Sequence, residues 1–316
     1  MMMINRIYSC QRNTQRSMTW PKRIPIISWT SKLKPPVPKV ITFDAYNTLY
    51  STTLPVMEQY GLVGKKYGIE ADPQQLTQNF VTVFKELKSQ HPNYGKTTRI
   101  SANDWWCLLI QGVFQPLSPP REMVDEILTR FEGSGAYEVL PDVKSFLQKV
   151  KSQYPDVIMG IVSNTDPVMY TLLKNIGLYE YFQGHIYLSY DLEVKKPGKE
   201  IFERALEDIV SKNPELKRIS NLASRCWHIG DEEVNDMLAA SNVGWNGILL
   251  DRVNKYGYLS ESFDKVQRTE HHLSIDKIDG NSEEVYRQSI SQTDIVQASE
   301  RTFIASNFES LKRMLL

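Results

Sequence analysis

The sequence contains little cysteine, and its cysteines are not arranged for cross-linking or for metal binding. Cys10, Cys107 and Cys226 are odd in number, far apart and without a CxxC pair, which excludes a disulfide framework and favours a reducing compartment. No run of about 18 apolar residues occurs, so we expect no membrane-spanning helix. Neither sign of charge is in excess, with 37 Lys and Arg against 37 Asp and Glu. These ordinary fractions exclude a mostly disordered chain or a fibrous repeat.

Acidic residues are absent before Asp44, whereas basic residues are frequent there. The eight basic residues of this stretch are Arg6, Arg12, Arg16, Lys22, Arg23, Lys32, Lys34 and Lys39. Many hydroxyl residues lie among them and no continuous apolar segment does, so residues 1–38 are typical of a mitochondrial transit peptide. The alternative is the basic tail of a cytosolic or nuclear protein, which contacts nucleic acid or a membrane surface. Three prolines between positions 35 and 38 predict an extended linker before the fold begins.

The remaining chain predicts a body of two parts. From 55 to 135 apolar residues such as Leu76, Phe80 and Phe84 recur at helical spacing, with no clear strand pattern. Elsewhere strand and helix patterns alternate. We expect strands at 39–43, 157–162, 185–188, 226–229 and 247–250, and helices at 141–150, 167–176, 201–210 and 234–241. Such alternation predicts an α/β fold with a Rossmann-like parallel sheet.

The predicted organisation is therefore a sheet core interrupted by a helical domain. Residues 39–54 and 136–259 form the core, and residues 55–135 form the inserted helical cap. The polar stretch 260–301 has no sustained period and is expected to be a surface insertion. Residues 302–316 close the core, with an edge strand at 303–304 and a helix at 308–316.

Polar side chains follow several of the predicted strands. Asp44, Ser163 with Asn164, and Asp231 lie at strand ends, and Lys196 lies in the loop after the strand at 185–188. Because ligands of open parallel sheets bind beyond the carboxyl ends of the strands, we expect these groups at one edge. Carboxylates hold Mg²⁺, a hydroxyl and an ammonium bind anionic oxygens, and an aspartate can attack as a nucleophile. The set suits chemistry on an anionic substrate with a hard cation such as Mg²⁺.

The order of these segments resembles the haloacid dehalogenase (HAD) superfamily of hydrolases. Four segments resemble its motifs I to IV, namely Phe43–Leu49, Val162–Asp166, Lys195–Phe202 and His228–Asp236. Asp104, Trp105 and Trp106, inside the helical part, are similar to the subgroup around HAD-like hydrolase domain-containing protein 3. The resemblance covers residues 39 to 252 and the last helix, and it implies the HAD fold with a helical cap.

The resemblance also implies roles for individual residues. Asp44 would be the nucleophile and a Mg²⁺ ligand, and the main-chain carbonyl of Tyr46 a second ligand. Ser163 would bind a phosphoryl oxygen, Asn164 would shape the loop that carries Ser163, and Lys196 would offset negative charge. The remaining assignments are Asp231 as a metal carboxylate, Asp236 as a metal partner or as an orienting group for Lys196, and Thr48 beside Tyr46 at the substrate gate.

One position departs from the pattern of HAD phosphatases. These enzymes usually carry a second aspartate two residues after the nucleophile, where this chain has Tyr46. A phenol with an ordinary pKa of about 10 is a poor base near neutrality, and loss of a general acid and base costs about 10²–10⁴-fold in rate. The first motif instead resembles the 2-haloacid dehalogenases, but the Gly230–Asp231 pair resembles the metal motif of the phosphatases.

Three functions remain open from the sequence. The first is a Mg²⁺-dependent hydrolase, slowed by Tyr46, that acts on a phosphorylated or other anionic metabolite. The second is a catalytically impaired scaffold with a binding or regulatory role, and the third is halide displacement. We expect no nucleic-acid partner for the folded part, and composition does not determine the oligomeric state. Tyr46, Trp105 and Trp106 are expected to serve in packing, and His228 to support the site from inside a strand.

Overall fold

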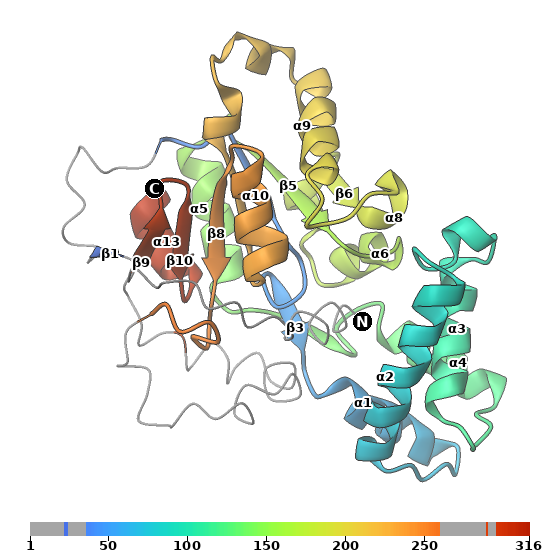
Figure 1. The fold of residues 1–316 in the computed structure, drawn as a ribbon. Helices are drawn as coiled ribbons and strands as arrows, with labels where there is room; N and C mark the ends of the chain where they lie inside the picture. The colour runs from blue at the N-terminus through green and yellow to red at the C-terminus, as the bar shows by residue number, and fades with distance from the viewer. Residues whose placement is uncertain (1–21, 25–35, 260–288, 290–294) are drawn as a thin grey trace, which may run out of the picture.

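The computed structural model describes residues 22–24, 36–259, 289 and 295–316. An eight-stranded sheet has the order β1-β9-β10-β8-β7-β2-β5-β6 (Figure 1). The strands from β10 to β6 in this order are parallel to one another, and β9 runs antiparallel to β10 and to β1. Their bounds are β1 Lys22–Ile24, β2 Val40–Phe43, β5 Ile158–Ser163, β6 Ile186–Leu188, β7 Cys226–Gly230, β8 Asn246–Leu250, β9 Ile295–Ser299 and β10 Thr302–Ala305. The predicted fold class, a parallel Rossmann-like sheet, is confirmed.

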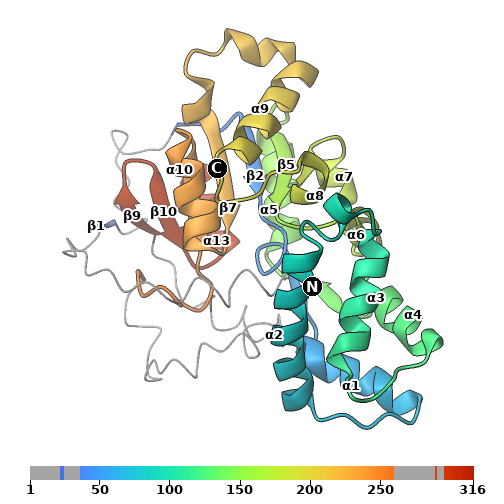
Figure 2. The ribbon, with the colours of Figure 1, turned by 45° about the vertical axis from the view of Figure 1, so that its right-hand side comes forward.

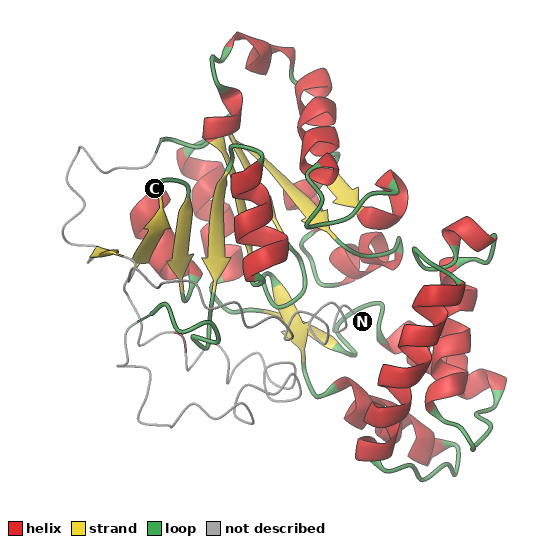
Figure 3. Ribbon diagram, in the orientation of Figure 1, coloured by secondary structure: helices red, strands yellow, loops and turns green. Residues whose placement is uncertain are grey.

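Helices cover both faces of this sheet (Figure 3). On one face, α5 (Val143–Gln153), α6 (Val168–Asn175) and α13 (Phe308–Leu315) pack against the strands through apolar side chains such as Phe146 and Phe308. On the other face, α9 (Glu200–Lys212) and α10 (Ala239–Asn242) share a second apolar cluster with β2 and β5. Short helices α7 (Tyr179–Phe182) and α8 (Ser189–Leu192) flank β6. The strands are therefore buried on both faces, as their continuous apolar composition predicts.

The inserted part is helical, as the periodicity predicts. It comprises α1 (Val56–Lys66), α2 (Pro73–Gln90), the 3₁₀-helix Lys96–Thr98, α3 (Ala102–Val113) and α4 (Arg121–Arg130). Asp72 accepts a hydrogen bond from the Gln74 N–H and begins α2, and Ser101 accepts one from the Asp104 N–H and begins α3. Figures 1 and 2 show these helices gathered beside the layered core. Among the described residues, no helix has both the length and the apolarity that a bilayer span requires.

A small two-stranded sheet joins the helical part to the core. β3 (Tyr50–Thr52) precedes the helices, and β4 (Tyr137–Val139) follows them and pairs antiparallel with β3. Neither strand is predicted by the sequence, because each has only three residues and no local pattern identifies so short a strand. Their pairing brings together the two segments that connect the helical part to the core. β3 follows directly after the loop that carries Asp44.

The C-terminal part of the sheet corrects two expectations. Ile295 and Val296 are buried in β9, so the end of the segment expected to be a polar surface insertion belongs to the sheet. β10 covers the expected strand at 303–304, but it lies between β8 and β9 and is not an edge. The prediction failed because β9 depends on pairing with β10. The rest of the expected insertion lies outside the described residues, apart from Ser289.

The expected leader lies mostly outside the described residues. Residues 22–24 are an exception, because they form β1 and pair antiparallel with Ile295–Gln297 of β9. The sequence predicts its first strand only at 39–43. The predicted transit peptide therefore stays a prediction.

A buried ion pair connects the start of α5 with the segment after β8 and with the first residue of α13. Both guanidinium Nη atoms of Arg252 donate to the carboxylate of Asp142, at 3.1 and 2.9 Å. Asp142 Oδ2 also accepts a hydrogen bond of 2.8 Å from the Phe308 N–H. Asp142 is 2% exposed and Arg252 is 4% exposed. One carboxylate thus holds three segments that are distant in the sequence.

We expect Asp142→Asn to lower the free energy of unfolding by about 3–5 kcal/mol, because it leaves the Arg252 charge buried without a counter-charge. Urea denaturation followed by circular dichroism measures this change. Asp125→Asn is the matched control, because Asp125 makes an exposed pair with Arg121 on α4 and should cost less than about 1 kcal/mol. Equal costs for the two variants would contradict the structural role of the buried pair.

Candidate active site

The register of the central strands brings two aspartates to the same edge of the sheet. Phe43 at the end of β2 lies opposite Ile229 of β7. The Asp44 N–H then donates to the Ile229 carbonyl at 2.8 Å, and Asp231 follows β7 directly. The prediction that the polar strand ends meet is therefore confirmed for these positions.

Asp44 is held by two side chains from other elements. Ser163, the last residue of β5, donates its hydroxyl to Asp44 Oδ1 at 2.9 Å. The Lys196 ammonium donates to the same oxygen at 2.8 Å. Asp44 is 9% exposed, so its carboxylate is oriented in a mostly dry environment. The two hydrogen bonds to Oδ1 fix the orientation of the Asp44 carboxylate.

Lys196 links Asp44 to Asp236. Its Nζ atom donates to Asp236 Oδ1 at 2.6 Å as well as to Asp44. Burial disfavours the ammonium charge, but the carboxylates of Asp236 and Asp44 hold the pKa of Lys196 above its ordinary range. The side chain therefore stays cationic and supplies a fixed positive charge next to Asp44.

The loop of Lys196 is fixed by Asn164. The Asn164 amide donates to the Lys196 carbonyl at 2.9 Å, and its oxygen accepts from the Lys196 N–H at 2.8 Å. Both main-chain groups of Lys196 are thus satisfied by one side chain. The sequence did not predict this contact with the Lys196 loop, and the expected role of Asn164 in shaping the loop of Ser163 stays a prediction.

Asp236 lies in a π-helix, Glu233–Leu238, which directly follows the strand-end loop. Its Oδ1 atom accepts from Lys196 and from His228 Nε2, at 2.6 and 3.1 Å, and its Oδ2 atom accepts from the Glu232 N–H at 2.9 Å. Burial opposes its charge, but Lys196 and His228 keep the pKa of Asp236 below its usual range. Of the two roles considered from the sequence, these contacts favour the orienting of Lys196.

Two neighbours position Asp236. His228, inside β7, is fully buried and also makes a 2.8 Å hydrogen bond between Nδ1 and the Thr42 hydroxyl. Burial lowers the pKa of His228, so the ring is neutral, and its proton lies on Nε2 because the carboxylate can only accept. At Gly230, a Cβ atom would lie 2.1 Å from Asp236 Cγ. Only glycine leaves room for Asp236 here.

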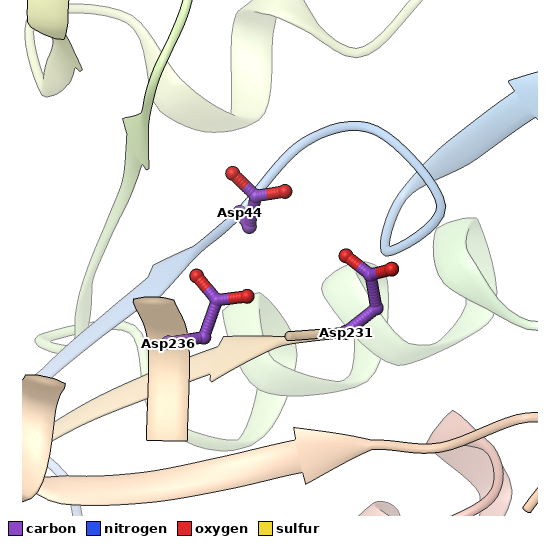
Figure 4. Close-up of side chains that lie close together, drawn as sticks. All are labelled: Asp44, Asp231 and Asp236. Carbon is purple, nitrogen blue, oxygen red and sulfur yellow. The ribbon is translucent and has the colours of Figure 1, made fainter. Parts of the chain in front are cut away.

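The three carboxylates form a candidate metal site. Ligand oxygens of Asp44, Asp231 and Asp236 all lie within 4.8 Å of one another, and all three residues are buried. Figure 4 shows that they come from only two segments, the end of β2 and the stretch after β7. Carboxylate oxygens are the protein ligands that hard divalent cations prefer. Because both oxygens of Asp236 already accept hydrogen bonds, Asp44 and Asp231 are the carboxylates better placed for a cation.

Tyr46 lies in an aromatic cluster beside the site. Its ring centroid is 6.1 Å from that of Tyr50 and 6.2 Å from that of Tyr137, and the residue is 4% exposed. The loop that carries it is closed by hydrogen bonds from the Leu49 N–H to the Ala45 carbonyl and from the Asn47 N–H to the Tyr50 carbonyl. These contacts agree with the expected packing role of Tyr46.

Thr48 is completely buried two residues further along the same loop. Its hydroxyl has no hydrogen-bond partner among the described residues. Unsatisfied hydroxyls are costly in a protein interior. The expected place of Thr48 at a substrate gate stays a prediction.

The helical part contacts the core through hydrogen bonds that the sequence does not predict. Trp106 Nε1 donates to Asp166 Oδ2 at 3.0 Å, and the Tyr94 hydroxyl donates to the Asn164 carbonyl at 3.2 Å. Burial raises the pKa of Asp166, although hydrogen bonds from the Val168 N–H and from Trp106 oppose the rise. Trp105 packs inside the helical part, as expected. No local signal pairs Trp106 with Asp166, because 60 positions separate them.

A parallel sheet with carboxylates at its strand ends and a buried lysine beside them is the arrangement that the four sequence motifs predicted. Residues 38–244 match the haloacid dehalogenase-like hydrolases. The chain belongs to this family, as the four motifs predicted.

Similar proteins agree with this assignment. An uncharacterized protein of Saccharomyces cerevisiae is 54% identical over 300 residues, which are 94% of this chain and 99% of the relative. Haloacid dehalogenase-like hydrolase domain-containing protein 3 of Xenopus laevis is 25% identical over 217 residues, 67% of this chain and 84% of the relative. The structure of L-2-haloacid dehalogenase from Xanthobacter autotrophicus has a TM-score of 0.53 at 14% identity, covering 88% of this chain and 98% of that chain. At this identity the likeness shows the fold alone.

Proposed function

We propose that this protein is a Mg²⁺-dependent hydrolase of a small phosphorylated or otherwise anionic metabolite, with Asp44 as nucleophile. The observation that carries the proposal is the setting of Asp44. One of its oxygens is held by the Ser163 hydroxyl and the Lys196 ammonium, at 2.9 and 2.8 Å, and Asp231 shares the same edge. A positive charge, a hydroxyl and two acidic groups at one point suit an anionic substrate together with a divalent cation.

The donor set fits Mg²⁺. Asp44 and Asp231 would supply two carboxylates, and the main-chain carbonyl of Tyr46 would supply a third oxygen by resemblance to the family. These are all hard oxygen ligands, and the cluster contains no thiolate or imidazole that would select a softer metal. When bound, the cation would neutralise part of the negative charge that Asp44 and the substrate bring together.

The reaction follows from the groups present. An Asp44 oxygen attacks the phosphorus atom, a bond forms between them, and the bond to the leaving oxygen breaks. Lys196 stabilises the charge that gathers at the transferred group, and Ser163 orients the nucleophile. Water then releases the product from Asp44. Each half of this reaction requires a proton transfer, for which the Tyr46 phenol is poorly suited near neutral pH.

We propose that the helices α1 to α4 act as a cap over this edge. Their contacts to the core support this, because Trp106 and Tyr94 reach Asp166 and Asn164 in the loop that begins at Ser163. A cap in this place would exclude water from the nucleophile and contact the variable part of the substrate.

Tyr46 supports a second candidate function. A protein that keeps Asp44 but lacks the acid and base could bind an anionic metabolite without appreciable turnover, as a binding or regulatory scaffold. Halide displacement, the third candidate, needs no leaving-group acid and no metal. The three candidates differ in turnover and in their dependence on a cation.

Removal of the metal separates them. Full-length protein should hydrolyse at least one ester in a panel of small phosphate esters in the presence of Mg²⁺, and excess EDTA should lower that rate at least about 100-fold. Addition of Mg²⁺ beyond the chelator should restore it. Halide release from 2-haloacids that persists in EDTA would support the dehalogenase reaction instead. Absence of turnover with saturable, Mg²⁺-dependent binding of an ester would support the scaffold.

A further inference from the structure

A pocket lies where the helical part meets the core, and its lining does not include the carboxylates of the active site. It has a volume of about 250 Å³. The helical part contributes side chains of α2, α3 and the turn between them, and the core contributes Asn164, Ser189 and the loop 193–195. Asp44, Tyr46, Thr48 and Asp231 are not among its lining residues.

One wall of the pocket is aromatic. Phe84 and Trp105 meet edge to face with ring centroids 5.4 Å apart, and Tyr94 contacts Trp105 at the same centroid separation. All three residues line the pocket. Rings held in this way offer a rigid apolar surface for a flat group.

The rim of the pocket is cationic. Lys88 of α2 and Lys195 of the core loop both line it. Neither makes an ion pair with a carboxylate among the described residues. Loss of hydration and the positive charge of Lys195 lower the pKa of Lys88, the direction expected for two cations that line one pocket. The acidic residue in the lining, Glu193, is paired with Lys96 at 3.1 Å.

We propose that this pocket is a binding site, separate from the Asp44 cluster, for a small molecule that combines an aromatic ring with an anionic group. The ring would lie against Phe84, Tyr94 and Trp105, and the anion would lie between Lys88 and Lys195. Because one lysine belongs to the helical part and the other to the core, the bound anion would replace repulsion between the two parts with attraction. A ligand held in this way stabilises the closed arrangement.

Phenylphosphonate is a suitable probe because its carbon–phosphorus bond resists hydrolysis. It is titrated into full-length protein in EDTA, with tryptophan fluorescence and calorimetry as readouts, since Trp105 lines the pocket. We expect saturable binding that is tighter than that of inorganic phosphate, which lacks the ring, and of benzyl alcohol, which lacks the charge. An aryl carboxylate, phenylacetate, distinguishes phosphoryl from carboxylate ligands by their relative affinity.

Lys88→Gln and Lys195→Gln should each weaken phenylphosphonate binding by about tenfold, the loss of one charge-assisted contact. Lys85→Gln is the matched control, because Lys85 is exposed on the same helix and does not line the pocket. Absence of saturable binding would overturn the proposal. So would an unchanged affinity in Lys88→Gln, which would place the ligand elsewhere. These measurements do not depend on turnover, so they are independent of the proposed hydrolase function.

Discussion

Asp44→Asn is expected to lower phosphate-ester hydrolysis by at least about 10³-fold, because the substitution removes the attacking carboxylate. Asparagine has nearly the same size and still offers an oxygen to the Ser163 hydroxyl and to the Lys196 ammonium. Lys196 also keeps its contact of 2.6 Å with Asp236. The fold should therefore survive, and the loss should appear in kcat.

The experiment needs both a rate and a measure of folding. Steady-state kinetics on the best ester of the panel provides kcat, and thermal denaturation shows that the variant is folded. Asp125→Asn is a matched control, since Asp125 lies on the exposed surface of α4 and should leave the rate unchanged. Full activity in Asp44→Asn would show that another group attacks, and the proposed mechanism would then be wrong.

The position of the site at one edge of the sheet could be predicted because the pattern around each of its residues is local in the sequence. Asp44 and Asp231 each follow a short apolar strand, and the parallel arrangement of such strands is sufficient to bring their ends together. The helical part could be predicted for a similar reason, since its apolar residues recur at a helical period. Both predictions required only patterns within about ten residues.

Features that depend on distant pairing could not be predicted. The Arg252–Asp142 ion pair joins positions 110 apart, and the Trp106–Asp166 hydrogen bond joins positions 60 apart. Strand β9 follows a polar stretch and is recognisable only beside its partner β10. The orienting role of Asp236 was left open, because a π-helix adds a residue to the turn and changes which side chain faces Lys196.

Tyr46 occupies the position at which HAD phosphatases usually carry a second aspartate. Its backbone lies two residues after Asp44, in a loop closed by main-chain hydrogen bonds from Leu49 to Ala45 and from Asn47 to Tyr50. Since these bonds do not involve the side chain, a substitution should leave the position of residue 46 unchanged. An aspartate there would carry its carboxylate beside the same loop.

Tyr46→Asp is therefore expected to raise kcat for phosphate esters by about 10²–10⁴-fold, the usual contribution of a general acid and base. Removal of the aromatic ring from its contacts with Tyr50 and Tyr137 should also cost about 3–5 kcal/mol of stability, so kinetics are measured below the unfolding temperature of the variant.

Tyr46→Asn separates the two consequences of the substitution. It opens the same space and loses the same ring contacts, but it cannot exchange a proton at neutral pH. If only the acid and base are missing, kcat of the aspartate variant should exceed that of the asparagine variant by about 10²–10⁴-fold. If both variants have equal rates, the tyrosine does not limit turnover by its chemistry. Both variants would still keep Asp44, Lys196 and the carboxylate cluster. Equal rates would therefore place the limit on turnover in the fit of the substrate between the core and the helical part.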